Sequence, residues 1–263
     1  MNNQYLNVCL APMEIRWGDK NANLDNLTNI LETVHPETDL VVLPECFSTG
    51  FPSGMDKEEV RPLAERNTEG TIELLKQLAH KHNVAIAGSF IANSGGSLYN
   101  RGFFIEPSGE EYFSDKRHLF TMAGEHNVFS RGYDRMKVRY RGWEIAMVIC
   151  YDIRFPVWCR NVNNDYDLLL AVANWPNARV AAWDTLLHAR AIENEAYVCG
   201  VNCKGTDIKG YEYNGSSAII DFKGKDMAIQ SDDLLYARLS KEKLDNFREK
   251  FPAYADADAF IIS

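Results

Sequence analysis

Apolar residues along the chain occur in two kinds of run, which alternate through the first ninety or so positions. The segments LNVCLA, DLVVLPE and VAIAGSF are continuously apolar, as strands covered on both faces are. Between them, residues 23–34 and 71–82 carry leucine, isoleucine, valine and alanine at helical spacing. This order predicts a strand–helix–strand–helix–strand unit with a parallel sheet.

The middle of the chain has a different pattern, typical of antiparallel hairpins. NRGFFIEPSGEEYFSD is predicted to turn at 107–109, and RMKVRYRGWEIAMVIC at 141–142. After residue 150 the alternation resumes. It predicts a short helix from about Arg154, a strand at DLLLAVA, a long helix over 180–194, a strand at AYVCGVN, and a hairpin of SSAIIDF with DMAIQ around 223–224.

These elements predict one α/β domain over residues 1–263, with two similar halves that are each covered by helices. No stretch rich in glycine, serine or proline divides the chain. The tail at about 251–263 ends in the apolar segment AFIIS, which makes it a candidate for an interface between subunits.

Composition narrows the class of protein. With 263 residues, 46% hydrophobic, the chain can bury a large core. A net charge of −9 argues against nucleic acid as a partner, because phosphate backbones require a basic surface. The first residues lack the pattern of a signal peptide and no run is long enough for a membrane span, so we expect a cytoplasmic protein without a membrane partner.

The six cysteines lie mostly in apolar, strand-like runs, as free thiols do in a reducing compartment. Cys199 and Cys203 are close in sequence, but no second pair or histidine follows at ligand spacing. We therefore expect neither a disulfide framework nor a zinc site.

Reactive side chains follow three of the predicted strands. Glu45 comes after DLVVLP, Lys116 after EEYFSD, and Cys150 ends EIAMVI. Singly, each has an ordinary interpretation: a carboxylate that caps a turn, a solvated ammonium and a core thiol. Ligands in open α/β sheets bind beyond the carboxyl ends of strands, so the three can meet at one rim, as a cluster suited to covalent catalysis.

Such a cluster contains the groups that covalent catalysis requires. Cys150 needs help to ionise, which we expect from the Lys116 ammonium and from the N-terminus of the helix near Arg154, with Glu45 taking the proton. When the thiolate attacks a carbonyl carbon, Lys116 and the backbone N–H of Tyr151 can hold the developing oxyanion. Glu45 then protonates the leaving amine, so the cluster predicts amide hydrolysis through a thioester.

A histidine is the usual base beside a catalytic thiol, and three histidines are available. His188 falls in the middle of a predicted helix, where an ordinary role is expected. His118 and His126 flank the loop after Lys116, and we expect them to line the site rather than to act as the base.

The segments PECFSTGF, SDKRHLF and ICYDIRFP, with AGEHNVFSRG between the last two, resemble the signature segments of the nitrilase, or carbon–nitrogen hydrolase, superfamily. The resemblance covers essentially the whole chain. It implies a four-layer α-β-β-α sandwich, no cofactor, and a homodimer that pairs helix layer to helix layer. It also implies Glu45 as base, Lys116 as oxyanion stabiliser and Cys150 as nucleophile, with Glu125 supporting the lysine and the leaving group.

Within the superfamily, CYDIRFP, LLLAVANWP and HARAIENEAYV are similar to the omega-amidase branch. That similarity implies hydrolysis of the terminal amide of 2-oxoglutaramate or 2-oxosuccinamate. One departure is Val157, where the motif often continues with glutamate. Two alternatives stay open: a nitrile or N-carbamoyl amine substrate within the same superfamily, and a non-catalytic thiol sensor that uses Cys150.

A substrate carboxylate requires a cation in the pocket, and Arg154 is the first candidate because guanidinium binds carboxylate through two hydrogen bonds. The alternative is a surface ion pair between Arg154 and Asp152. Phe120, Met122 and Trp175 are candidates for apolar walls around a small substrate, and the alternative for each is an ordinary core position.

Overall fold

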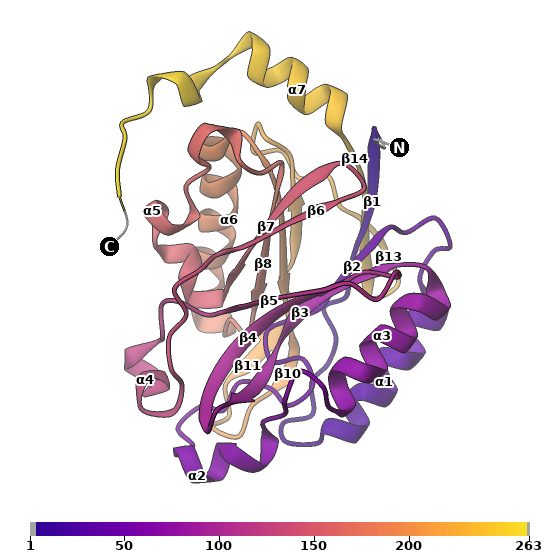
Figure 1. Ribbon diagram of the computed structural model, residues 1–263, viewed down its shortest axis with the longest axis vertical. Helices are drawn as coiled ribbons and strands as arrows, with labels where there is room; N and C mark the ends of the chain where they lie inside the picture. The colour runs from indigo at the N-terminus through magenta and orange to yellow at the C-terminus, as the bar shows by residue number, and fades with distance from the viewer. Residues whose placement is uncertain (1–3, 262–263) are drawn as a thin grey trace.

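The computed structural model describes residues 4–261, whose strands form two main sheets stacked face to face (Figure 1). The first sheet has, in spatial order, β13 (Ile229–Ser231), β14 (Leu234–Ser240), β1 (Tyr5–Leu10), β2 (Leu40–Val42), β3 (Ala85–Ser94), β4 (Ser97–Ile105) and β5 (Glu111–Asp115). The second has β12 (Ala218–Ile220), β9 (Tyr197–Asn202), β8 (Leu168–Ala173), β7 (Trp143–Ile149) and β6 (Met136–Tyr140). A small ribbon pairs β10 (Lys204–Thr206) with β11 (Glu212–Asn214).

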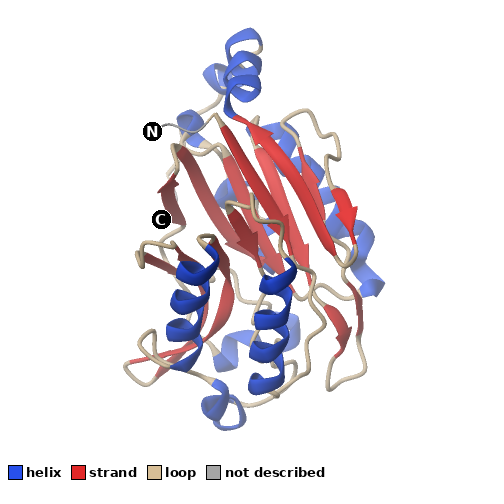
Figure 2. Ribbon diagram, turned by 90° about the vertical axis from the view of Figure 1, so that its right-hand side faces the viewer, coloured by secondary structure: helices blue, strands red, loops and turns tan. Residues whose placement is uncertain are grey.

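Helices cover the outer face of each sheet. In Figure 2, α1 (Lys20–Thr33) and α3 (Gly70–His82) lie in front of the first sheet, whereas Figure 1 has α5 (Pro156–Cys159) and α6 (Val180–Asn194) on the opposite side of the strands. The remaining helices are α2 (Lys57–Val60), α4 (Glu125–Val128) and α7 (Lys241–Lys250). The predicted four-layer α-β-β-α sandwich is confirmed.

The central strands are continuously apolar because each of their faces is buried against a different layer. On β1, Leu6, Val8 and Leu10 belong to the core between the two sheets. Cys9, between them, packs with Leu27 of α1 in the core under the helices. The alternation of strand side chains therefore divides one apolar run between two cores.

Strand directions follow the predicted pattern. β1, β2 and β3 pair in parallel, as do β7, β8 and β9. The two predicted hairpins are the antiparallel pairs β4–β5 and β6–β7. In the second, Arg141 and Gly142 have φ values of 51° and 85°, as a two-residue hairpin turn of primed type requires.

The second half differs from the prediction in two details. The predicted short helix is α5, which begins at Pro156, a residue that suits a first helical turn, and a 3-10 helix at Cys150–Arg154 precedes it. SSAIIDF and DMAIQ also form no extended hairpin: after one bridge between Ile220 and Asp226 the chain crosses over, and β13 pairs with β14 in the first sheet. Local alternation does not specify which sheet a strand joins.

Gly200 provides a test of how α6 packs on the second sheet. A Cβ atom on this β9 residue would lie 2.4 Å from both terminal carbons of Leu187. We expect Gly200→Ala to lower the free energy of unfolding by about 1–3 kcal/mol through overpacking, and Leu187→Ala to lower it by about 2–5 kcal/mol through a cavity. Because the truncated leucine leaves room for the methyl group, the double variant should lose less than the sum. Urea titration measures all three; additive losses would mean that the two side chains do not meet.

Candidate active site

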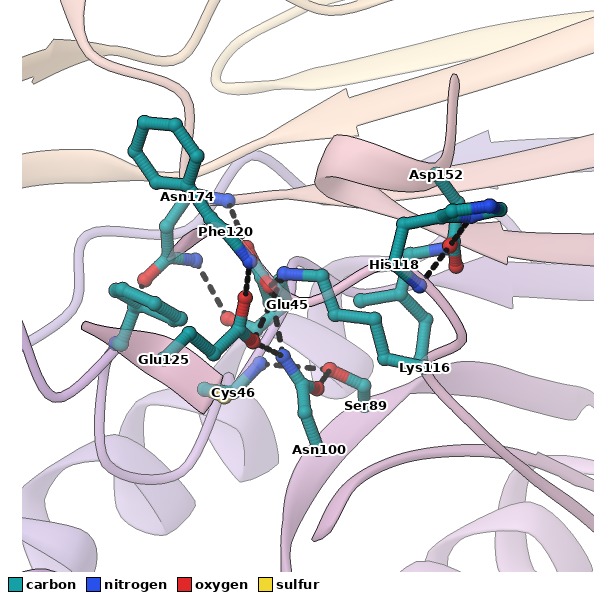
Figure 3. Close-up of polar contacts among 12 residues, drawn as sticks. Glu45, Cys46, Ser89, Asn100, Lys116, His118, Phe120, Glu125, Asp152 and Asn174 are labelled. Carbon is teal, nitrogen blue, oxygen red and sulfur yellow. Dashed lines mark hydrogen bonds and ion pairs between the residues drawn. The ribbon is translucent and has the colours of Figure 1, made fainter. Parts of the chain in front are cut away.

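The three side chains that were predicted to meet line one cavity at the carboxyl ends of strands from both sheets. Glu45 follows β2, Lys116 follows β5, and Cys150 follows β7. Lys116 Nζ lies 2.9 Å from Glu45 Oε1 and 3.0 Å from Glu125 Oε1 (Figure 3). Glu45, Lys116 and Glu125 are buried, while Cys150 keeps partial exposure toward the cavity.

Hydrogen bonds from both sheets hold the Glu45 carboxylate. Asn100 on β4 donates from Nδ2 to Oε1 at 2.7 Å, and the backbone N–H of Asn174, just after β8, donates to Oε2 at 2.8 Å (Figure 3). The Asn174 side chain also donates to the Glu45 carbonyl. Ser89 orients Asn100 by donating to its Oδ1 at 2.9 Å. The carboxylate is therefore fixed by three donors, of which Lys116 is the third.

Glu125 completes the charged cluster from the start of α4. One carboxylate oxygen accepts from Lys116, and the other accepts from the backbone N–H of Phe120. Burial alone would lower the pKa of Lys116, but the charges of Glu125 and Glu45 outweigh it and hold that pKa well above its usual range. Burial raises the pKa of Glu125, against the opposing charge of Lys116. The ammonium is therefore charged at neutral pH.

Cys150 begins the 3-10 helix with a φ of 47°, in the left-handed region that side chains other than glycine rarely adopt. Burial and the negative charge of Glu45 raise the pKa of its thiol well above the usual value, and Lys116 opposes this shift. The predicted help from a helix N-terminus stays a prediction; a 3-10 helix begins at Cys150 itself and α5 begins at Pro156. At rest the group is a thiol rather than a thiolate.

His118 was expected to line the site, but it lies outside the cavity. Its ring stacks on Phe155 with centroids 3.7 Å apart, and its backbone N–H donates to Asp152 Oδ1 at 2.8 Å. The same carboxylate accepts from the backbone N–H of Ile149 at 3.1 Å. His118 and Asp152 thus join the segment after Lys116 to the turn that carries the thiol.

The other two histidines also lie away from the cavity. His126 is exposed on α4. The Nδ1 atom of His188 lies 2.8 Å from the carbonyl of Asp184 one turn earlier in α6. Of the described residues that line the cavity, none is a histidine and one, Glu45, is a carboxylic acid.

The cavity has a volume of about 310 Å³, near the lower limit for small-molecule sites. Trp175 forms a rigid wall: its backbone N–H donates to Asn202 Oδ1 at 2.7 Å, and its carbonyl accepts from Asn202 Nδ2 at 2.8 Å. Met122 is 88% exposed, so it lies at the mouth and is not a core residue. The remaining residues of the lining without formal charge are Phe51, Phe120, Tyr151, Asn174 and Pro176.

Arg154 lines the cavity and does not pair with Asp152, whose carboxylate is occupied by His118 and Ile149. Its guanidinium lies 4.8 Å from the ring centroid of Trp175, a cation–π contact. The turn that carries Arg154 is supported from below by Arg190 of α6, whose guanidinium donates twice to the carbonyl of Ile153.

Sequence reasoning missed Asn100, Asn174 and Arg179. Asn174 follows the strand DLLLAVA, so the rule that selected Glu45 would also have selected it. Arg179 lies in the same connection and lines the cavity. Asn100 lies within an antiparallel strand, where no local signal marks a polar residue as part of a site.

Two general features of residues 4–261 bear on other classes of site. In that part of the chain no group of three histidine, cysteine or acidic side chains is arranged to hold a metal ion. None of the helices between those limits has the length and apolar character needed to cross a membrane.

The opposing effects of Glu45 and Lys116 on Cys150 can be measured by alkylation with iodoacetamide. We expect Glu45→Gln to raise the rate at pH 8, because it removes a charge that raises the pKa of the thiol. Lys116→Met should lower the rate; each unit of pKa changes the thiolate fraction about tenfold. In the parent chain the rate should still rise above pH 9. Mass spectrometry of the Cys150 peptide gives the rates, with Cys150→Ser as background, and equal rates in all chains would refute this coupling.

Comparisons with known proteins agree with this geometry. The family model described as carbon-nitrogen hydrolase matches residues 7–249. The chain is 42% identical over 260 residues to the omega-amidase YafV of Yersinia enterocolitica, which covers 98% of each chain. It is 32% identical over 255 residues to the 2-oxoglutaramate amidase of Bacillus subtilis, covering 94% of this chain and 95% of the relative.

A solved structure gives the same result for the fold. The crystal structure of XC1258 from Xanthomonas campestris, described as a CN-hydrolase superfamily protein with an arsenic adduct in the active site, superposes with a TM-score of 0.93 at 37% identity. The superposition covers 99% of this chain and 100% of that one. With two sheets, a buried glutamate and lysine, and a thiol at their shared rim, the chain belongs to the carbon–nitrogen hydrolase family.

Proposed function

We propose that this carbon–nitrogen hydrolase is an omega-amidase, which hydrolyses the terminal amide of 2-oxoglutaramate or 2-oxosuccinamate to the 2-oxo dicarboxylate and ammonia. One observation carries the proposal: Glu45, Lys116 and Cys150 lie at the buried end of a small cavity that Arg154 also lines. A thiol, a base and a cation for an oxyanion suit amide cleavage, and Arg154 suits the substrate carboxylate. The names of the relatives at 42% and 32% identity support the same activity.

The first half of the reaction forms a thioester. The raised pKa of Cys150 means that its proton moves to Glu45 as the sulfur attacks the amide carbon, and no thiolate is stored beforehand. The carbonyl oxygen gains the negative charge, which the Lys116 ammonium and the Tyr151 N–H stabilise. N–H groups in the first turn of a helix lack partners within that helix, which supports this role for Tyr151. The carbon–nitrogen bond then breaks, Glu45 protonates the nitrogen, and ammonia leaves.

The second half hydrolyses the thioester. Glu45 takes a proton from a water molecule, whose oxygen attacks the same carbon, and Lys116 with the Tyr151 N–H again holds the oxyanion. The carbon–sulfur bond breaks, the sulfur recovers the proton, and the carboxylate product leaves. Glu125 lies 3.0 Å from Lys116, which supports the part of its predicted catalytic role that concerns the lysine.

The cavity supports separate roles for the remaining residues of the predicted site. Phe120 and Trp175 would be the apolar walls, and Met122 would cover the mouth. The buried Glu45–Lys116 pair in the same cavity disfavours the thiol-sensor alternative, because redox sensing by Cys150 has no need of either group.

Ammonia release from 2-oxoglutaramate tests the proposed activity. Cys150→Ala should abolish it without lowering the unfolding midpoint, and Glu45→Gln should lower kcat by about 10²–10⁴-fold as expected for loss of a general base. Intact mass spectrometry of the parent chain during turnover should find an acyl group on Cys150. Activity retained in Cys150→Ala would exclude the mechanism, and a higher kcat/KM on small nitriles or ureido acids would transfer the proposal to those substrates.

We further propose one domain, a cytoplasmic location and a homodimer. Side chains from both sheets share one core, which supports a single domain. All six cysteines are free, as is usual in a reducing compartment.

For the dimer, exposed Val157, Val162 and Ile192 lie in or beside the outer helix layer, and the exposed tail passes the same side (Figure 1). Residues 262 and 263 of the tail lie outside the described part.

Deleting residues 254–263 tests the role of the tail in assembly. It removes the exposed Phe260 and Ile261, together with Tyr254. We expect light scattering to give the dimer mass for the full chain and a shift toward the monomer mass for the shortened chain, since apolar surface drives association. A shortened chain that stays fully dimeric would place the interface on the helix layer alone.

A further inference from the structure

The rim of the cavity carries two arginines whose positive charges are not paired with any carboxylate of the described residues. Arg154 and Arg179 both line the cavity, and in residues 4–261 neither guanidinium has a hydrogen bond or ion pair to the protein. Most other cationic side chains near the site do have such partners, as Lys116 does with Glu45. A second guanidinium without a carboxylate, in a cavity for which one substrate carboxylate is proposed, requires an explanation.

Both arginines are held by aromatic walls. The Arg154 guanidinium lies 4.8 Å from the Trp175 ring centroid, and that of Arg179 lies 5.5 Å from the ring centroid of Phe120. The indole N–H of Trp175 donates to the backbone carbonyl of Arg179 at 2.8 Å. Trp175 therefore supports the Arg154 guanidinium on its ring and holds the backbone of Arg179. Asn202 in turn fixes the backbone of Trp175. The aromatic contacts leave the N–H edges of both guanidinium groups available to a ligand.

The buried end and the rim of the cavity differ in net charge. At the buried end, Lys116 is shared between Glu45 and Glu125, so no free positive charge remains there. At the rim, two positive charges face the ligand without a carboxylate among the described lining residues other than Glu45. An anion would therefore bind with its charged end at the rim and its other end toward Cys150.

We propose that Arg179 is a specificity-determining residue which, together with Arg154, binds the 2-oxo acid end of the substrate. A 2-oxo carboxylate presents three acceptor oxygens on adjacent carbons, which can satisfy donors from two guanidinium groups, whereas a saturated carboxylate presents two. The choice of a 2-oxo acid rests on the proposed function, whereas its binding through Arg179 can be measured without any hydrolysis. Arg179 acts here by contact with the substrate, away from the reacting carbon.

Binding of 2-oxopentanoate and of pentanoate to the full chain separates this inference from catalysis, because neither compound has an amide to hydrolyse. NMR titration gives both dissociation constants. For Arg179→Met we expect the Kd of 2-oxopentanoate to rise about tenfold, the size of one lost charge-assisted hydrogen bond, and that of pentanoate to rise less than about threefold. Arg179→Lys should fall between the parent and Arg179→Met, because it keeps the charge but loses the planar fork.

Arg131→Met is the matched control for net charge. Arg131 is exposed, its guanidinium lies 5.1 Å from the Tyr133 ring centroid, and it does not line the cavity. This variant should bind both compounds as the parent does. Thermal unfolding of each variant confirms that the fold is intact.

Three outcomes would overturn the inference. They are unchanged binding in Arg179→Met, an equal loss for both compounds, and a parent chain that binds 2-oxopentanoate no better than pentanoate. Ammonia release from 2-oxoglutaramate by the same variants is a separate measurement, which tests the proposed function. A chain that binds 2-oxopentanoate through Arg179 but hydrolyses no amide would retain this inference and reject the proposed function.

Discussion

The buried carboxylate of Glu45 is the interaction on which the rest of the site depends. A carboxylate without exposure to water costs several kcal/mol unless donors replace its hydration. Here the donors come from opposite sheets, with Asn100 and Lys116 on one side and Asn174 on the other. The Glu45 carboxylate therefore helps to set the relative position of the two sheets at their shared rim, in addition to the apolar core between them.

The same network explains why the thiol is kept protonated. Glu45 and the surrounding burial oppose a second negative charge on Cys150, and Lys116 only partly compensates because it is already shared between two carboxylates. A protonated thiol is less prone to oxidation and alkylation than a stored thiolate. In the proposed mechanism, charge therefore separates only when a substrate carbonyl can accept it.

Much of this arrangement could be predicted from sequence, because continuous apolar strands and helical spacing are local signals. Glu45, Lys116 and Cys150 each follow a predicted strand, so the rule for strand ends was enough to group them. Contacts that depend on non-local pairing could not be predicted: the crossing of β13 to the other sheet, the outward ring of His118, and Asn100 within a hairpin strand. Arg179 was missed for a different reason: β8 ends at Ala173, and Arg179 lies too far along the connection for the rule for strand ends to select it.

Consecutive residues in the connection after β8 have two different roles. Asn174 donates to the Glu45 carboxylate, whereas Trp175, Pro176 and Arg179 line the cavity. Asn202 holds the backbone of Trp175 through hydrogen bonds to its N–H and its carbonyl. A substitution after Trp175 therefore need not displace Asn174. Evolution can therefore alter residues 176–179 to admit a different amide while the chemistry is inherited intact, which offers a physical route by which one scaffold diversifies its substrates.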